Sequence, residues 1–209
     1  MKPDSDKQWK RFLEYSELAR AKPTFDAEER EWRLLIAERI HEVLRAARDG
    51  GDWHGLLNMT YRQGGLFRFI SSARAHKVWF DACAAADPEA ARSALAAFLE
   101  PDQEAEERFA SFARALEEAE PRGVKVETTP AMTLGSACNF AVEPLSVPIM
   151  RPGFFRTLAQ ILGYKQSEPA SIADAYAQHL AFARWLRSRM EESGFPIRDM
   201  IDLAQVSGV

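Results

Sequence analysis

Apolar residues recur every three or four positions along several stretches of this 209-residue chain, and that period constrains its fold more than any other feature. Such spacing places the apolar side chains on one face of an α-helix. The clearest stripe lies between Glu28 and Arg48 and consists of Trp32, Leu35, Ile36, Ile40, Val43, Leu44 and Ala47. Similar stripes run through residues 87–101, 102–120 and 171–194. The sequence therefore predicts a mainly α protein.

Several helix ends can also be predicted from the sequence. Asp87 followed by Pro88 suits an N-cap and the first helical position, because aspartate accepts a backbone N–H bond there and proline lacks an N–H. Ser171 and Asp174 have the spacing of a capping box, with Asp in place of the usual Glu. A last short helix is expected after Pro196.

The stretch from Pro121 to Gly153 departs from helical periodicity and contains five prolines, at positions 121, 130, 144, 148 and 152. Proline inside a helix removes a hydrogen bond and clashes with the preceding turn, so this spacing rules out one long helix. Residues 124–128 alternate in polarity as a short strand would. We therefore expect an irregular, proline-rich crossover with at most a small β-hairpin.

One globular domain is expected, because no sequence period repeats and no low-complexity tract is present. We assign residues 25–209 to a helical domain and residues 1–24 to a mobile N-terminal lead-in. No apolar run approaches the ~18 residues of a membrane span, and the polar start lacks the features of a secretory signal. The two cysteines, Cys83 and Cys138, are expected to be reduced thiols. These features predict a cytoplasmic protein without a membrane partner.

Charge is distributed unevenly along the chain, although the formal net charge is only −4. Residues 61–80 contain four basic residues and no acidic residue. Residues 86–121 contain ten acidic residues against three arginines, a local balance of −7. Such asymmetry can orient a protein on a polyanion or on a complementary protein surface.

The basic stretch, residues 61–80, combines its four cations and His76 with a glycine pair and several aromatic residues. This combination is typical of a nucleic-acid-binding surface. Cationic side chains neutralise phosphates, exposed rings stack on bases, and a turn leading into a helix offers backbone N–H groups to an anion. The alternative is that its apolar residues form core and its arginines only a solvated rim. The apolar residues in question are Leu66, Phe67, Phe69, Ile70 and Trp79.

A second basic group surrounds residues 152–155, at the expected start of another helix. It consists of Arg151, Arg156 and Lys165, and the spacing leaves open whether it meets the first group. The candidate nucleic-acid-binding residues are therefore Arg62, Arg68, Arg74, Lys77, Arg151 and Arg156.

Three charged residues close to the C-terminus have helical spacing. Arg198 and Asp202 are four residues apart, which suits an ion pair on one face of a helix, and Asp199 would then be a free carboxylate. A structural role for the three is favoured over a functional one.

Enzymatic alternatives have less support in the sequence. Cys138 could act as a thiol nucleophile with a histidine as base, but no local signature accompanies it. The available histidines are His41, His54, His76 and His179. The chain contains no H-E-x-x-H or paired C-x-x-C metal motif and no G-x-x-x-x-G-K-[ST] phosphate-binding loop. We therefore expect no metal and no cofactor, and a Cys/His enzyme is the least favoured hypothesis.

A series of short segments occurs in a particular order along the chain. It comprises Glu28–Ala37, Asp52–Trp53, Gly65–Phe67, Arg108–Phe112, Val147–Pro152, Leu162–Tyr164, Ala175–Tyr176 and Arg198–Asp202. This series resembles the region N-terminal to the motor in McrB-like AAA+ restriction proteins of bacteria, and short free-standing relatives of that region. The resemblance extends from about Phe25 to the C-terminus.

The resemblance implies a helical accessory module in a bacterial defence system, which recognises a target or contacts subunits while an AAA+ ATPase and a nuclease do the chemical work. By this resemblance, Arg151 matches the arginine after a proline pair, and Arg198, Asp199 and Asp202 match a closing R-D-x-x-D. The chain departs from the pattern in two places. At residues 147–150 the pattern is more aromatic and has two prolines, and residues 203–209 lack the pattern's terminal tryptophan. The pattern carries no catalytic role to transfer.

Two functional hypotheses of different classes follow. The first is a non-enzymatic module that contacts DNA through its basic surface. The second is a protein-interaction subunit that docks a motor or nuclease without touching DNA, through the acidic stretch 87–120 or an exposed apolar patch.

Overall fold

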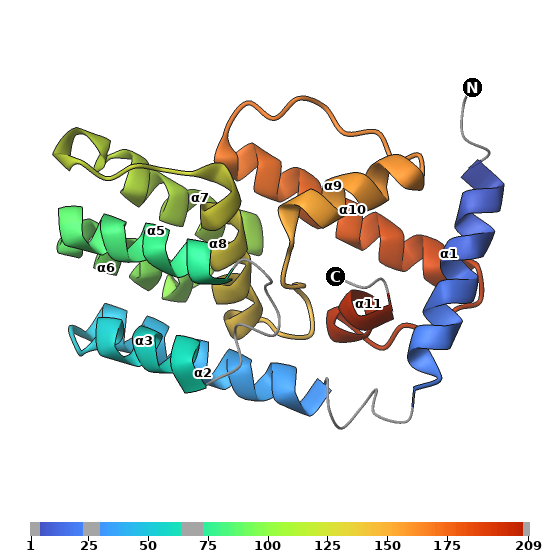
Figure 1. Ribbon diagram of the computed structural model, residues 1–209, viewed down its shortest axis with the longest axis horizontal. Coiled ribbons are helices and arrows are strands. Elements are labelled where there is room, and N and C mark those ends of the chain that lie inside the picture. The colour runs from blue at the N-terminus through green and yellow to red at the C-terminus, as the bar shows by residue number, and fades with distance from the viewer. Residues whose placement is uncertain (1–4, 23–29, 64–72, 207–209) are drawn as a thin grey trace.

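The computed structural model of the chain describes residues 5–22, 30–63 and 73–206. These residues form α-helices and two short 3-10 helices, with no strand among them, which confirms the predicted mainly α class (Figure 1). The elements are α1 (Ser5–Arg20), α2 (Glu31–Asp49), α3 (Trp53–Gln63), α5 (Ala73–Ala86), α6 (Pro88–Ala96), η2 (Ala97–Leu99), α7 (Ala105–Glu117), η3 (Glu120–Arg122), α8 (Thr128–Val142), α9 (Pro152–Ile161), α10 (Ile172–Glu192) and α11 (Met200–Val206).

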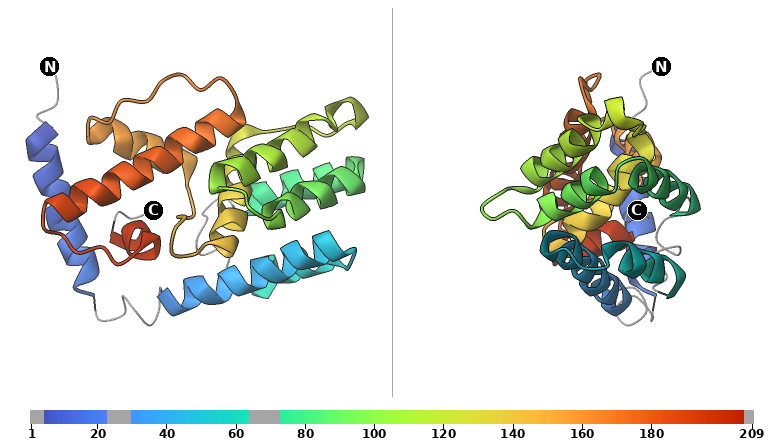
Figure 2. Two further views of the ribbon diagram at one scale, coloured as in Figure 1. Left: turned by 180° about the vertical axis from the view of Figure 1, so that it is seen from behind. Right: turned by 90° about the vertical axis from the view of Figure 1, so that its left-hand side faces the viewer.

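Helix α8 is the central element of the fold. Every residue from Ala131 to Ala141 is buried, and the helix contacts α2, α5, α7, α9 and α10. In Figure 1, α5 to α7 lie on one side of α8, and α9 to α11 with α1 lie on the other. Figure 2 shows the same division from behind, so α8 joins the two halves of the molecule.

The expectation of an irregular crossover was therefore wrong for residues 128–142. Pro130 is the third residue of α8, inside the first turn, where a missing N–H removes no intrahelical bond. The remainder of the helix contains no proline. Because α8 is enclosed by other helices, it is apolar or small-sided all round and shows no one-sided stripe. Residues 124–127 are irregular, so the alternating stretch forms no strand, which is compatible with the expectation of at most a small hairpin.

The predicted helix starts are confirmed. The Asp87 carboxylate accepts a hydrogen bond of 2.9 Å from the Ala90 N–H, and Pro88 occupies the first turn of α6. The Ser171 hydroxyl accepts from the Asp174 N–H at 3.1 Å. The Asp174 carboxylate bonds back to the N–H of Ala170 at 2.8 Å, one residue before the cap, so the capping box is shifted by one position.

We expect Ser171→Ala to lower the free energy of unfolding by about 1 kcal/mol, because the first turn of α10 loses its side-chain acceptor. Ser171→Asp keeps an acceptor at the same position and should retain most of the stability. Urea unfolding followed by circular dichroism measures both variants. Equal loss in the two would contradict a capping role.

The segment assigned to an N-terminal lead-in contains helix α1. The Trp9 indole N–H donates to the Ser193 hydroxyl at 3.0 Å, and the Phe12 side chain is buried. The Arg189 guanidinium lies over the Trp9 ring at 4.8 Å from the centroid and over Trp185 at 5.6 Å. These contacts hold α1 against the C-terminal end of α10. Helix α1 was not predicted, because its many charged residues obscure the apolar stripe in the sequence.

Candidate nucleic-acid interface

The first basic group lies at the end of α3 and along α5. Arg62 is exposed and makes no hydrogen bond or ion pair with any residue that the structure describes. Lys77 is half-buried and forms an ion pair with the Asp81 carboxylate one turn further along α5. Arg68 and the side chain of Arg74 lie outside the described residues. Arg62 is thus the member of this group that the structure leaves available to a phosphate.

The aromatic and imidazole side chains of α5 belong to the core instead. Trp79 is buried, and its indole N–H donates to the Lys125 carbonyl oxygen at 2.7 Å. His76 is also buried, with Nδ1 3.4 Å from the Pro130 carbonyl oxygen. For Trp79 the core alternative is correct. Trp79 links α5 to the segment before α8, and His76 links α5 to the first turn of α8. The apolar residues 66–70 lie outside the described part of the chain.

The second basic group lies at the start of α9, where a helix was expected. Pro152 is in its first turn, and Phe155 is buried against Phe182 in an edge-on contact with ring centroids 5.9 Å apart. Arg151 is half-buried at the N-cap position, whereas Arg156 is exposed and makes no ion pair within the described ranges. Lys165 is exposed as well. The buried face of α9 therefore directs Arg156 outward.

The structure keeps the two basic groups on separate helices. Helices α5 and α9 both pack against α8, and in the view of Figure 1 they lie on its two sides. Most arginines elsewhere are ion-paired with a carboxylate, namely Arg30, Arg48, Arg92, Arg108, Arg122, Arg184, Arg187 and Arg198. Arg62 and Arg156 have no ion pair with a described carboxylate, and the same holds for the exposed Arg11, Arg45 and Arg114.

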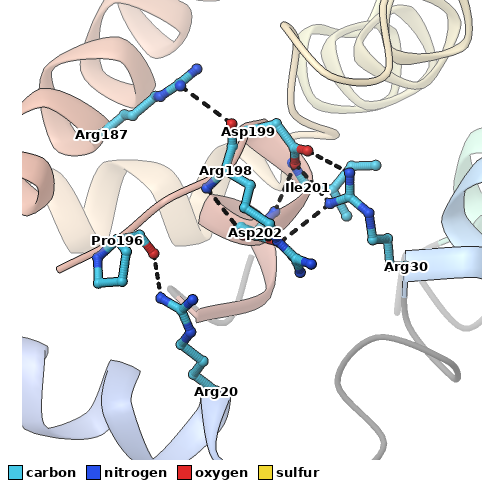
Figure 3. A network of polar contacts seen from close by, with 8 residues as sticks. All are labelled: Arg20, Arg30, Arg187, Pro196, Arg198, Asp199, Ile201 and Asp202. Atoms are coloured by element: carbon cyan, nitrogen blue, oxygen red, sulfur yellow. Dashed lines mark hydrogen bonds and ion pairs between the residues drawn. The ribbon is translucent and has the colours of Figure 1, made fainter.

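The C-terminal charged residues form a compact network with Arg30 (Figure 3). The expected pair of Arg198 and Asp202 is confirmed, with Nε of Arg198 2.7 Å from the carboxylate. Asp199 is not free, since its carboxylate lies 2.5 Å from Arg30 and also accepts the Ile201 N–H at 2.9 Å. Burial alone would raise the pKa of Asp199, but Arg30 and the backbone amides outweigh it and hold that pKa below its ordinary value.

Sequence reasoning missed Arg30 as the partner of Asp199. The two residues are 169 positions apart, and no spacing rule connects residues so distant in sequence. Arg30 also approaches Asp202 at 3.3 Å, so it links the start of α2 to Asp199, just before α11, and to Asp202 within α11. The network thus has a structural role, as favoured from the sequence, because each charged group in it has a partner.

The structure contradicts a nucleophilic role for Cys138. Its thiol is buried in the middle of α8, and this burial raises its pKa well above that of an ordinary cysteine. Reactive cysteines need the thiolate and access to substrate, and Cys138 has neither. Cys83 is also buried, which raises its pKa to about 11.

No three described His, Cys, Asp or Glu side chains gather where they could hold a metal ion. None of the described helices is long and apolar enough to cross a membrane.

The two buried histidines, His76 and His179, predict a pH dependence of stability. Burial lowers the pKa of both imidazoles, so the folded protein keeps them neutral where the unfolded chain, with a pKa of about 6.5, takes up protons. Stability is therefore fully present above about pH 7 and falls as the pH drops below 6.5. Each histidine contributes a slope of up to about 1.4 kcal/mol per pH unit.

Urea unfolding between pH 7.5 and 5.5 measures this slope. His179→Gln should remove about half of it, because one of the two buried imidazoles is lost. Stability that increases on acidification through this range would contradict the assignment.

Comparison of the chain with protein-family models, with characterised proteins and with solved structures gives no match.

Proposed function

We propose that this protein is a non-enzymatic accessory or recognition module of a bacterial, restriction-like defence system, and that it contacts DNA through its basic surface. The observation that carries the proposal is the pair of exposed arginines, Arg62 and Arg156, which no described carboxylate neutralises. An exposed arginine that has no ion pair keeps its positive charge available to a phosphate.

The start of α9 supports the same function. The first N–H groups of a helix have no intrahelical acceptor and carry the positive end of the helix dipole, which favours an anion. Arg156 and Lys165 add exposed positive charge to this helix and the segment after it. The proposed set of DNA contacts also includes four residues that are chosen by their position in the sequence, namely Arg68, Arg74, Lys77 and Arg151.

The defence context is supported by the resemblance to the non-motor region of McrB-like proteins. In that context an AAA+ ATPase or a nuclease is the proposed partner, because the buried Cys138 leaves this chain without its candidate nucleophile. The cytoplasm is the compartment in which such a module meets DNA.

A second candidate function is protein docking without DNA contact. Three glutamates lie at the end of α7 and the start of η3, namely Glu117, Glu118 and Glu120. All three are exposed and have no ion pair within the described residues. This acidic end would attract a basic surface on a motor or nuclease. Co-purification of that partner in the absence of nucleic acid would favour this function over the first.

The DNA proposal is tested by fluorescence anisotropy with labelled duplex and single-stranded DNA at two salt concentrations. If about four phosphates are neutralised, the affinity should fall about 100-fold between about 50 and 200 mM salt, because each contact releases a condensed counterion. Absence of binding to either form at the lower salt concentration would remove DNA contact from the proposed function.

A further inference from the structure

A surface groove lies between α2 and the C-terminal end of α8. Its volume is about 510 Å³, within the range of sites that take a few side chains or a small ligand. Leu34 and Ala37 of α2 line it together with Ala141 and Pro144, which gives it an apolar floor. Leu35 and Leu145, which follow the lining residues Leu34 and Pro144 in sequence, are exposed.

One stripe of α2 provides the whole wall of the groove on that side. Its members are Leu34, Ala37, Glu38, His41, Glu42 and Arg45, which recur at the three- and four-residue spacing of one helical face. This stripe differs from the buried stripe of α2, which packs into the core through Ile36, Ile40, Val43 and Leu44. Helix α2 therefore has a second organised face, and that face lies on the groove.

The lining of the groove has more negative than positive charge, since it contains Glu38 and Glu42 against Arg45. Glu38 and Glu42 are exposed, one turn apart, and neither has an ion pair within the described residues. Like charges at this spacing destabilise a helix slightly, and a cation placed between them would remove that cost. None of the proposed DNA contacts lines this groove, so the two surfaces are separate.

His41 adds a hydrogen-bonding group to the wall. Its Nδ1 lies 3.3 Å from the Ala141 carbonyl oxygen, which can only accept a hydrogen bond. The proton of a neutral ring is therefore at Nδ1, which leaves Nε2 as an acceptor for a ligand with N–H donors.

We propose that this groove binds a segment of a partner protein that presents a lysine or arginine beside an aliphatic side chain. The aliphatic group would cover the floor formed by Leu34, Ala37, Ala141 and Pro144, while the cation would lie between Glu38 and Glu42. Apolar burial supplies affinity and the two carboxylates select the charge. The proposal goes beyond the proposed function, because it identifies a protein-binding surface that uses none of the DNA contacts.

The probe for this site is a fluorescein-labelled peptide of alternating leucine and arginine. A matched peptide with glutamate in place of each arginine controls for charge, and arginine amide controls for a small cation. Anisotropy reports the affinity, and ¹H–¹⁵N chemical shifts report which residues respond. We expect the basic peptide to bind, the acidic peptide not to bind, and the largest shifts to occur along the groove stripe of α2.

Charge-neutralised variants locate the contact. The double substitution Glu38→Gln and Glu42→Gln should weaken basic-peptide binding about tenfold or more, because both carboxylates are lost. The matched double substitution Glu14→Gln and Glu31→Gln removes two exposed carboxylates outside the groove and should leave the affinity unchanged.

Four results would overturn the proposal. They are absence of binding at millimolar basic peptide, equal binding of the acidic peptide, equal weakening by the two double variants, and arginine amide binding as tightly as the peptide. The last result would make the groove a small-cation site. Because none of these measurements contains DNA, their failure is distinguishable from failure of the proposed function.

Discussion

Asn139→Leu is expected to lower the free energy of unfolding by about 3–5 kcal/mol. Asn139 is completely buried in α8, and its side-chain oxygen accepts from Nε of Arg108 at 2.9 Å. Its amide nitrogen donates to the Ala105 carbonyl oxygen at 2.7 Å and to the Tyr176 hydroxyl at 2.9 Å. Leucine has a similar volume but satisfies none of these groups, so a largely buried guanidinium would lose a partner.

The location of this network explains the size of the effect. Asn139 joins α8 to α7 through Ala105 and Arg108, and to α10 through Tyr176, so one amide connects the two halves of the molecule. Urea unfolding followed by circular dichroism measures the loss. Asn58→Leu on α3 is the matched control, because that half-buried asparagine makes no hydrogen bond within the described residues. A loss below about 1 kcal/mol for Asn139→Leu would contradict the role of the network.

Gly135→Ala is the second large effect, and we expect it to destabilise the protein by about 1–3 kcal/mol. A Cβ added at Gly135 would lie 2.4 Å from Cε2 of Phe109, far inside van der Waals contact. The Phe109 ring cannot readily move, because it stacks on Tyr176 with ring centroids 4.1 Å apart. The close approach of α7 to α8 therefore requires glycine at this position.

Two comparisons test this explanation. Gly153→Ala makes the same chemical change where an added Cβ meets nothing within 4 Å, so it should be neutral or slightly stabilising. Phe109→Leu removes the ring edge, so the loss caused by Gly135→Ala should be smaller in that background. Equal and additive losses in the two backgrounds would show that contact with Phe109 is not the cause.

The periodic helices could be predicted from the sequence, since each of them has one buried face and one solvated face. Helix α2 follows the expected stripe except at Leu35, which is exposed. The N-caps at Asp87 and Ser171 follow from local chemistry. Helix α8 could not be predicted, because enclosure on every side removes the one-sided pattern and Pro130 resembles a helix breaker until its position in the first turn is known. The charges of α1 likewise obscure its contact with α10.

The candidate site could be predicted only in part. Residue type correctly indicated exposed arginines at positions 62 and 156, but it could not show that Asp81 pairs with Lys77. It also could not distinguish a stacking ring from a core ring, and Trp79 proved to be core. Burial and pairing depend on residues distant in sequence, as Arg30 and Asp199 show.

The proposed DNA contact of Arg62 and Arg156 can be tested by a charge-matched comparison of two double variants. One double variant carries Arg62→Glu and Arg156→Glu, and the other carries Arg11→Glu and Arg114→Glu at exposed positions elsewhere, so both have the same net charge. At about 50 mM salt, the first variant should bind labelled DNA at least about 100-fold more weakly than the second. Equal affinities would show that these two arginines are not the site of DNA contact.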